Sequence, residues 1–284
     1  MAGTLYLVAT PIGNLEDMTY RAVRTLREAD LIACEDTRTS SHLLSAYEIS
    51  TPVTSYHKFN EREKSGELIG RLLRGEHIAL ITDAGMPAIS DPGEILVREC
   101  RRNHICVTAV PGASASVTAL ALSGLDTRRF LFEGFLPADN KERRELLAEL
   151  REETRTMIFY EAPHRLRKTL RELMETFGEE REITLCRELT KRYEEITPTT
   201  IGEAEKAAED TAPRGEYVLV VAGMSAQEKA ERRASGWEAT PIPEHVAHYE
   251  TQGMSRKDAM KAAAKDRGLT KRDIYAALLE DRTE

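Results

Sequence analysis

HIALITDAGMPAISDPG, at residues 77–93, joins an apolar run to a stiff, acidic turn. The run at 78–82 has the length and the β-branched content of a buried strand. The eleven residues at 83–93 then hold two aspartates, two prolines and two glycines, all of them turn-forming types. Asp91 followed by Pro92 fits an N-cap and the first residue of a helix. A buried strand that leads through a short turn into a helix indicates one unit of a parallel sheet.

Similar apolar runs occur on both sides of this stretch. They are TLYLVA at 4–9, LIAC at 31–34 and ICVTAV at 105–110. Apolar residues between the runs repeat at helical spacing: Ala22, Val23 and Leu26, then Leu68, Ile69 and Leu72. Strands that alternate with amphipathic helices predict a parallel sheet covered by helices. We therefore expect an N-terminal α/β domain at residues 1–123.

A second series of strand-like runs follows the segment SGLDTRR at 123–129. Its members are FLFEGF at 130–135, TMIFY at 156–160, ITLCR at 183–187 and YVLVVAG at 217–223. HRLRKTLRELMETF, at 164–177, carries apolar residues on one helical face, namely Leu166, Leu170, Leu173 and Phe177. This pattern predicts a second α/β domain at residues 124–224.

Strand patterning stops after Gly223, and the segment 240–284 has helical features instead. Ser255 and Thr270 are candidate N-caps, and Gly268 is a candidate C′ residue. These positions predict two helices, Ser255 to Arg267 and Thr270 to Arg282, in a helix-turn-helix-like arrangement. Their apolar inner face is expected to consist of Ala259, Ala263, Ile274, Ala277 and Leu278.

The composition is that of a soluble globular protein. The chain has 284 residues, a formal net charge of -8, 31% charged and 41% hydrophobic residues, which predicts about two compact units and excludes a disordered chain. No apolar run approaches the roughly 20 residues of a membrane span, and the start MAGTLYLVATPIGN has no basic leader, so we expect a cytoplasmic protein. The four cysteines, Cys34, Cys100, Cys106 and Cys186, form no C-x-x-C pair, and all but Cys100 lie in apolar runs, so buried free thiols are expected.

The expected binding site lies where the strands of the first sheet end. Ligands of open parallel sheets bind outside the carboxyl ends of the strands, where the loops meet. The segments that follow the other runs are ATPIGN at 9–14, CEDTRTS at 34–40 and VPGASAS at 110–116. Asp83 could contact a ligand there, or the turn could be an ordinary link from strand to helix. The phosphate-binding patterns G-x-G-x-x-G and G-x-x-x-x-G-K-[ST] are absent, which favours a ligand with a ribose and an amino acid but no phosphate.

Eight motifs resemble, in order and spacing, those of the tetrapyrrole-methylase superfamily. They are LYLVATPIGNLEDMT, CEDTR, ITDAGMPAISDPG, VPGASA, FEGFLP, YEAPHR, CRELTKRYEE and GEYVLVVAG. The likeness extends from residue 3 to about residue 223. It is greatest to the branch of ribosomal small-subunit RNA methyltransferases, methyltransferase I, whose C-terminal extension the basic tail resembles. Tetrapyrrole-modifying members usually carry Gly-Asp-Pro where this chain has Thr82, Asp83 and Ala84, which favours the RNA branch.

This resemblance implies a fold and a ligand. The fold would be two α/β domains of the class III methyltransferase type, with S-adenosyl-L-methionine in the cleft between them. The reaction would be methyl transfer to a cytidine ribose 2′-oxygen in the RNA of the small ribosomal subunit, performed by a homodimer without a metal. Carried over by position, the residues implied to bind the cofactor are Thr10, Pro11, Asp83, Gly85, Met86, Ser114, Ala115, Tyr160, Ala162, Glu216 and Tyr217.

A ribose hydroxyl is a poor nucleophile, so a base or cation that favours its deprotonation would assist an attack on a sulfonium methyl group. Candidates for this role are Glu35 and Arg38 in CEDTR, Glu161 in YEAPHR and Lys191 in CRELTK. Each motif also has a structural explanation. EDTR could cap a helix, Pro163 could begin one, and RELTK could be an ion-paired surface. The sequence leaves these alternatives open.

The tail is the expected RNA contact. Residues 252–275 carry seven basic and three acidic residues although the whole chain is acidic, so they offer phosphates a local basic surface. The residues predicted to reach RNA are Lys257, Lys261, Lys265, Lys271 and Arg272, unless they only solvate the helices. His245 and His248 have a metal-ligand spacing, but a solvated helix face is expected there. Trp237 and Tyr249 could stack on bases, but they are expected to pack the tail.

The predicted function is an S-adenosylmethionine-dependent methyltransferase of ribosomal RNA. One alternative is methylation of a porphyrinoid or another small molecule by the same fold. Another is a non-catalytic ribosome or RNA-binding factor on a methylase scaffold. Cofactor binding separates this last alternative from both enzymes, and the methyl acceptor separates the enzymes from each other.

Overall fold

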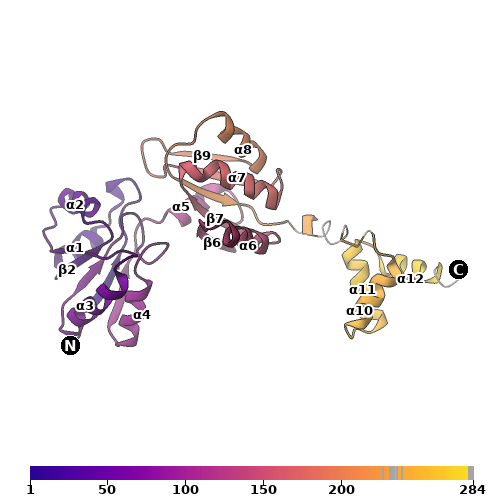
Figure 1. Cartoon of the computed structure of the whole chain (residues 1–284), viewed down its shortest axis with the longest axis horizontal. Coiled ribbons are helices and arrows are strands. Elements are labelled where there is room, and N and C mark those ends of the chain that lie inside the picture. The colour runs from indigo at the N-terminus through magenta and orange to yellow at the C-terminus, as the bar shows by residue number, and fades with distance from the viewer. Residues whose placement is uncertain (226, 230–233, 235, 238, 281–284) are drawn as a thin grey trace. The chain divides into compact units, whose positions relative to one another are not determined.

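The computed structural model describes residues 1–225, 227–229, 234, 236–237 and 239–280. The chain divides into two compact units. The first consists of Met1–Ala148 with Thr156–Ala222, and the second of Glu149–Arg155 with Gly223–Glu284. Two separate β-sheets lie within the first unit, and helices dominate the second (Figure 1). The predicted boundary between residues 123 and 124 stays a prediction, because both sheets belong to one unit.

The first sheet is parallel throughout, as predicted. Its strands are β1 (Thr4–Val8), β2 (Leu31–Cys34), β3 (Val53–Ser55), β4 (Ile78–Leu80) and β5 (Cys106–Val110), in the order β3-β2-β4-β1-β5. β1 pairs with β4 and β5, and β2 pairs with β3 and β4. The sequence did not reveal β3, which has three residues and an exposed Val53. All five strands therefore end at one edge of the sheet.

Helices cover both faces of this sheet. They are α1 (Tyr20–Glu28), α2 (Thr37–Ala46), α3 (Glu61–Leu73) and α4 (Glu94–Arg102), and η1 (Leu15–Asp17) precedes them as a 3-10 turn. Leu68 and Leu72 of α3 pack with Leu96 of α4 against one face. On the other face, Ala22 and Leu26 of α1 form a second cluster with α2. The helical spacing predicted for α1 and α3 is confirmed.

The second sheet is mixed. Its strands are β6 (Phe130–Phe135), β7 (Thr156–Glu161), β8 (Glu182–Arg187), β9 (Glu195–Thr200) and β10 (Tyr217–Val221), in the order β6-β7-β10-β8-β9. β6 and β7 are parallel, whereas β10 runs antiparallel to β7 and β8, and β8 runs antiparallel to β9. Four of these strands were predicted from the sequence. β9 was missed because Pro198 interrupts its pattern, which only an edge strand tolerates.

The two faces of this sheet have different neighbours. α5 (Ala115–Ser123) packs Ala119 and Leu120 against one face, in a cluster with Val218 and Val220. The remaining helices of the sheet are α6 (Asn140–Leu150), α7 (Pro163–Phe177) and α8 (Ile201–Asp210). The four apolar residues predicted to line one face of α7 are all buried. Because side chains alternate along a strand, Tyr160 and Glu161 at the end of β7 point to opposite faces.

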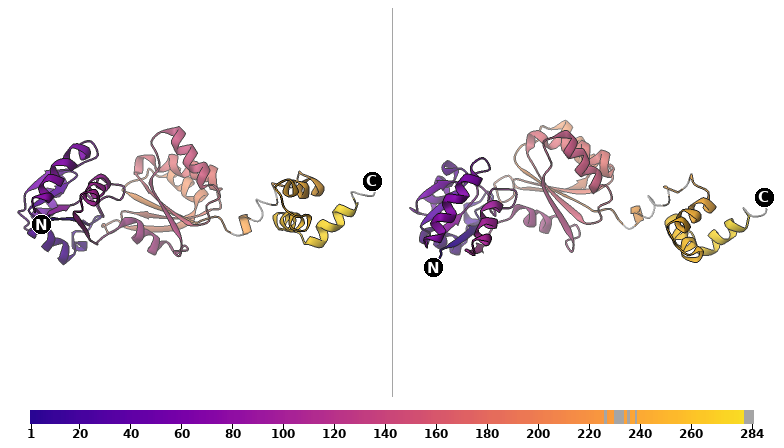
Figure 2. Two further views of the ribbon diagram at one scale, coloured as in Figure 1. Left: turned by 90° about the horizontal axis from the view of Figure 1, so that it is seen from below. Right: turned by 60° about the horizontal axis from the view of Figure 1, so that its bottom comes forward.

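Among the described residues, the C-terminal part of the second unit consists of three helices (Figure 2). They are α10 (Ile242–Thr251), α11 (Arg256–Arg267) and α12 (Lys271–Glu280), joined by the buried residues Val246, Ala259, Ala263, Ala264, Ile274 and Leu278. Ser255 caps α11, and Gly268 ends it with φ 64°. Thr270 precedes α12 as predicted, while the predicted end at Arg282 lies outside the described residues.

Three expectations were wrong. α4 begins at Glu94 with Gly93 as its N-cap, not at Pro92, because Gly93 has φ 145°, which is outside the helical region. Cys106 is exposed since β5 is an edge strand, although Cys34, Cys100 and Cys186 are buried. His245 is fully buried and not on a solvated face.

No helix in the described residues is long and apolar enough to cross a membrane.

Candidate functional site

Two loops are joined at the carboxyl edge of the first sheet. Thr10, just after β1, exchanges backbone hydrogen bonds with Gly85, at 2.9 and 3.1 Å. The Thr10 hydroxyl also donates to the carbonyl of Thr82 at 3.0 Å. Pro11 is buried beside this bridge, and Met86 is half-buried. The structure thus brings four of the predicted cofactor-binding residues and Asp83 into two adjoining loops.

The loop from Asp83 to Gly93 is strained. Gly85, Ala88, Ser90 and Gly93 have φ values of 82°, 68°, 64° and 145°. Ala88 and Ser90 are not glycines, so this left-handed conformation costs each of them free energy that the surrounding structure must offset. The strain holds the backbone of this loop in one shape at the edge of the sheet. Such outliers are concentrated at functional sites.

Four carboxyl groups gather around this loop. The backbone N–H of Asp36 donates to Asp83 Oδ1 at 3.4 Å, and the Thr82 hydroxyl donates to Glu35 Oε2 at 3.2 Å. Burial raises the pKa of Asp91 to about 6, and the carboxylates of Glu35 and Asp83 add to the rise, against a hydrogen bond from Thr82. Partial removal from water also raises the pKa of Asp83. The sequence interpretation missed Asp91 because the Asp-Pro step fits a helix cap.

Arg38 stands at the start of α2 and is exposed. Asp36, the N-cap of this helix, accepts from the Arg38 backbone and side chain at 2.8 Å each. Hydrogen bonds from Arg38 lower the pKa of Asp36 to about 2. The guanidinium therefore has a fixed carboxylate partner, and its other donors face solvent. The helix cap that EDTR could form is therefore present.

The second sheet contributes Tyr160. Its hydroxyl accepts from the backbone N–H of Ser116, in the first turn of α5, at 3.2 Å. Phe132 and Phe135 pack edge-on against its ring, with centroids 5.0 and 5.6 Å away. Ser114 is the N-cap of α5 without a side-chain cap bond, and Ala115 is its first residue. Tyr160 therefore lies against the positive end of a helix.

Lys191 lies in a tight loop after β8. Its ammonium donates to Glu188 Oε1 at 2.9 Å and to Glu216 Oε2 at 2.8 Å. Although partial burial opposes the change, these two carboxylates raise the pKa of Lys191. Gly13 fits against this loop, because a Cβ there would lie 2.5 Å from Lys191 Cγ. Lys191 thus joins the segment before β10 to the chain that follows β1.

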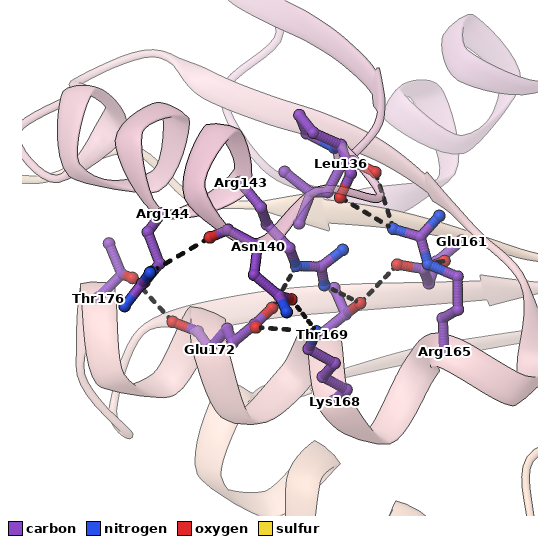
Figure 3. Close-up of polar contacts among 11 residues, drawn as sticks. Leu136, Asn140, Arg143, Arg144, Glu161, Arg165, Lys168, Thr169, Glu172 and Thr176 are labelled. Atoms are coloured by element: carbon purple, nitrogen blue, oxygen red, sulfur yellow. Dashed lines mark hydrogen bonds and ion pairs between the residues drawn. The ribbon is translucent and has the colours of Figure 1, made fainter.

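Glu161 is the centre of a buried polar network (Figure 3). It accepts hydrogen bonds from the Thr169 hydroxyl and, at 2.9 Å, from the backbone N–H of Ala162. Arg165 lies 3.5 Å from its carboxylate and donates to the carbonyl of Leu136 at 2.7 Å. Arg143, 2% exposed, donates to Thr169 at 2.6 Å and pairs with Glu172. The network joins α6, α7 and the turn that carries Ala162.

Tyr217 does not face the same way as Tyr160. It pairs with Glu161 across β7 and β10, whereas Tyr160 pairs with Val218 on the α5 side. The Tyr217 side chain lines a cavity of about 580 Å³ together with Arg187 and residues of β9 and α8. A ligand on the Tyr160 side could therefore meet only the backbone of Tyr217.

The five basic residues predicted to reach RNA are all exposed on the second unit: Lys257, Lys261, Lys265, Lys271 and Arg272. Behind them, the buried ring of His245 stacks on Trp237 with centroids 3.5 Å apart. Burial lowers the pKa of His245, and the charge of Arg267 lowers it further. Tyr249 donates to Asp266 within the same core. Trp237 and Tyr249 therefore pack the tail, as expected.

Two polar groups near the joined loops have unused hydrogen-bonding capacity. Within the described chain, the one hydrogen bond to the Asp83 carboxylate is long, at 3.4 Å, so the carboxylate can accept from a hydroxyl or an ammonium group. The buried Thr190 Oγ1, 3.0 Å from a Cβ position at Gly13, has no partner among the described residues. No group of three or more His, Cys, Asp or Glu in the described residues could hold a metal ion.

Comparison with known proteins defines the family. The model of the family Tetrapyrrole (Corrin/Porphyrin) Methylases matches residues 4–205, and the chain belongs to this family. A protein of Halalkalibacterium halodurans named ribosomal RNA small subunit methyltransferase I is 50% identical over 96% of this chain and 93% of its own. Its namesake in Bacillus subtilis is 46% identical over 97% of this chain and 94% of its own.

Solved structures share the fold. The cobalamin biosynthetic enzyme cobalt precorrin-4 methyltransferase matches with a TM-score of 0.59 and 18% identity, over 77% of this chain and 94% of its own. Uroporphyrin-III-C-methyltransferase from Thermus thermophilus matches with a TM-score of 0.54 and 20% identity, over 77% of this chain and 94% of its own. These similarities confirm the predicted class of fold.

Proposed function

We propose that this protein transfers a methyl group from S-adenosyl-L-methionine to a cytidine ribose 2′-oxygen in the RNA of the small ribosomal subunit. The observation that carries this proposal is identity of 50% over 96% of the chain with a ribosomal RNA small subunit methyltransferase I. The small-molecule methylases match 94% of their own length but 77% of this chain, so this chain has a further segment. Its basic C-terminal helices suit an RNA partner better than a porphyrinoid.

The methyl donor, when bound, supplies a methyl group on a positively charged sulfur. We assign its binding to the joined loops at Thr10 and Gly85, with Pro11 and Met86 beside them, and to the turns at Ser114, Ala115, Tyr160, Ala162 and Glu216. The Asp83 carboxylate would accept hydrogen bonds from the ribose or the ammonium group of the donor. The strained loop after β4 keeps this carboxylate in position before the ligand arrives.

The proton of the ribose hydroxyl needs an acceptor near the carboxyl edge. The Thr82 hydroxyl donates to Glu35 Oε2 at 3.2 Å and also influences Asp91, whose pKa of about 6 is close to the range in which a carboxylate acts as a base at neutral pH. We therefore propose that Glu35 and Asp91 hold the proton between them. Arg38, exposed at the start of α2 and paired with Asp36, would bind a phosphate of the RNA.

The other two catalytic candidates have positioning roles in this proposal. Glu161 is buried among Thr169, Arg165 and the Ala162 backbone, so it shapes the cofactor turn and does not meet the acceptor. Lys191 is held by two carboxylates, and it orders the loop against Gly13. The exposed basic residues of the tail, from Lys257 to Arg272, would bind RNA phosphates without reading sequence.

A homodimer is part of the proposal. Large apolar side chains are exposed on α5 and β6, among them Val117, Leu122 and Phe135. Such side chains are often covered by a partner subunit. The proposed substrate also implies that the enzyme works in the cytoplasm, where ribosomal subunits are assembled.

Transfer of tritiated methyl groups tests the proposed function. Purified small subunits that lack the modification should accept label from S-adenosyl-L-methionine, and porphyrinoids should not. Label in a porphyrinoid but not in the subunits would favour the small-molecule enzyme. Cofactor binding by calorimetry without transfer to either acceptor would favour a binding factor.

A further inference from the structure

A groove on the first unit is lined by residues other than those of the candidate site. It occupies about 430 Å³ beside α1 and the end of α2. Its lining consists of Met18, Tyr20, Val23, Arg24, Arg27, Glu28 and Tyr47. None of these residues belongs to the site at the carboxyl edge. Its volume falls within the range of about 300–1,000 Å³ typical of small-molecule sites.

The floor of the groove is apolar and fixed. Met18, Val23 and Tyr47 are partly buried and pack on the core beneath α1 and α2. The Tyr47 hydroxyl donates to the carbonyl of Leu15, and the Arg27 guanidinium donates to the Tyr47 carbonyl at 2.6 Å. Both ends of Tyr47 are therefore held in place. A flat apolar group could bind there without rearrangement of the floor.

One wall of the groove carries an aromatic ring that the fold does not use. Tyr20 is the first residue of α1 and is 98% exposed. Arg24 and Arg27 follow it at spacings of four and seven residues, which places all three on one side of the helix. The ring and the two guanidinium groups thus border the same apolar floor.

The charge of this helix surface is positive although the chain carries a net charge of -8. Arg21, Arg24 and Arg27 are exposed, and within the described part of the chain no ion pair neutralises any of them. The acids near the groove are Glu28 and, beside the Tyr47 hydroxyl, Asp17 and Glu16. A polyanion would therefore approach from the side of Arg21 and Arg24.

We propose that this groove binds an unpaired nucleotide of the substrate RNA, away from the ribose that receives the methyl group. The base would stack on Tyr20 over the apolar floor, and Arg21 and Arg24 would bind the flanking phosphates. Unpaired bases stack on aromatic side chains, and arginine contributes both charge and planar contact. The inference rests on the proposed function, because it takes RNA as the substrate.

Four variants test the groove: Tyr20→Ala, Tyr20→Phe, Arg24→Ala and the control Arg102→Ala. Arg102 is an exposed arginine at the end of α4, and it pairs with Glu99. Binding to purified small subunits is measured across a series of salt concentrations, together with methyl transfer and cofactor affinity. We expect Tyr20→Ala to raise the Kd for the subunit about five- to a hundredfold and Tyr20→Phe to restore it.

Arg24→Ala should lower the log-log salt slope by about one unit, and Arg102→Ala should leave it unchanged. Cofactor affinity should stay at the wild-type value in all four variants. If Tyr20→Ala and Arg24→Ala both kept the wild-type affinity for the ribosomal subunit and the wild-type salt slope, the inference would be overturned. The proposed function would still stand. If light scattering showed a changed oligomeric mass for Tyr20→Ala while its affinity for the ribosomal subunit stayed intact, the groove would belong to a protein interface. That result would overturn the inference too. Failure of the wild-type protein to bind or methylate subunits would instead count against the proposed function.

Discussion

The hydroxyl of Tyr160, at the end of β7, accepts a hydrogen bond from the backbone N–H of Ser116 at 3.2 Å. This bond connects the second sheet to the first turn of α5, which follows β5 of the first sheet. The neighbouring residue Glu161 points to the opposite face, where it belongs to a buried network. Adjacent residues of one strand thus serve two purposes, one at the candidate site and one in the support behind it.

Asp83→Asn should weaken binding of S-adenosyl-L-methionine by roughly tenfold to a hundredfold. The change removes a charge-assisted hydrogen bond, which contributes about 1.5–3 kcal/mol. Isothermal titration calorimetry measures the effect. Asp126→Asn is the matched control, because Asp126 is an exposed aspartate in an ion pair with Arg128. A folded Asp83→Asn protein with wild-type affinity would remove Asp83 from the cofactor site.

Asp91→Asn should raise the free energy of unfolding at pH 8 by about 1 kcal/mol after allowance for solvent screening. Burial raises the pKa of Asp91 to about 6, so the folded state binds the proton more tightly than the unfolded chain does. The contribution of Asp91 to stability is complete below the pKa that Asp91 has in the unfolded chain. It is lost as the pH rises through the pKa that Asp91 has in the folded protein. The difference between variant and wild type should therefore shrink towards pH 4.

Denaturant unfolding at pH 4, 6 and 8 provides this measurement. The same variant should transfer methyl groups more slowly, because the proposed proton acceptor is incomplete. A variant that is less stable than the wild type at pH 8 would show that ionised Asp91 contributes favourably to the fold.

Arg143→Met should lower the free energy of unfolding by about 3–5 kcal/mol, because it leaves Glu172 and Thr169 without their buried cation. Arg171→Met is the control. Arg171 pairs with Glu205 and Glu209 at the surface and is 56% exposed, so its loss should cost less than about 1 kcal/mol. If chemical denaturation showed equal losses of unfolding free energy in the two variants, the network of Figure 3 would be no stronger than a surface ion pair.

Substitution of Lys261, Lys265 and Lys271 by alanine together should lower the log-log salt slope of RNA binding by about two to three units. All three are exposed on the C-terminal helices, and cofactor affinity should not change. Lys64→Ala serves as a control because Lys64 is paired with Glu67. An unchanged salt slope in the triple variant would mean that these lysines only solvate the helices and do not contact RNA phosphates.

Strong periodic patterns in the sequence predicted most of the fold. The runs at β1, β2 and β4 are apolar and β-branched, and the spacing of Leu166 and Leu170 in α7 follows one helical face. Caps were equally informative in the tail, where Ser255 and Gly268 bound α11 as predicted. These features act over a few residues, so local sequence is enough to determine them.

Features that depend on distant partners could not be predicted. Asp91 looked like a helix cap, and only the fold shows that burial, together with the carboxylates of Glu35 and Asp83, raises its pKa. Gly93 is needed because Leu80 lies behind it, thirteen residues earlier in the chain. Glu161 follows Tyr160 directly, and the alternation of β7 separates their environments. The sequence contained these residues, but their roles come from tertiary contacts.

Mass spectrometry of nuclease-digested small-subunit RNA tests the central claim most directly. Unmodified subunits are incubated with S-adenosyl-L-methionine and either the wild-type protein or the Asp83→Asn variant. The account predicts one cytidine that gains 14 mass units on its ribose with the wild type, and a strongly reduced yield with the variant. A methyl group on a base, or RNA without any methyl group although the wild-type protein binds the cofactor, would contradict it.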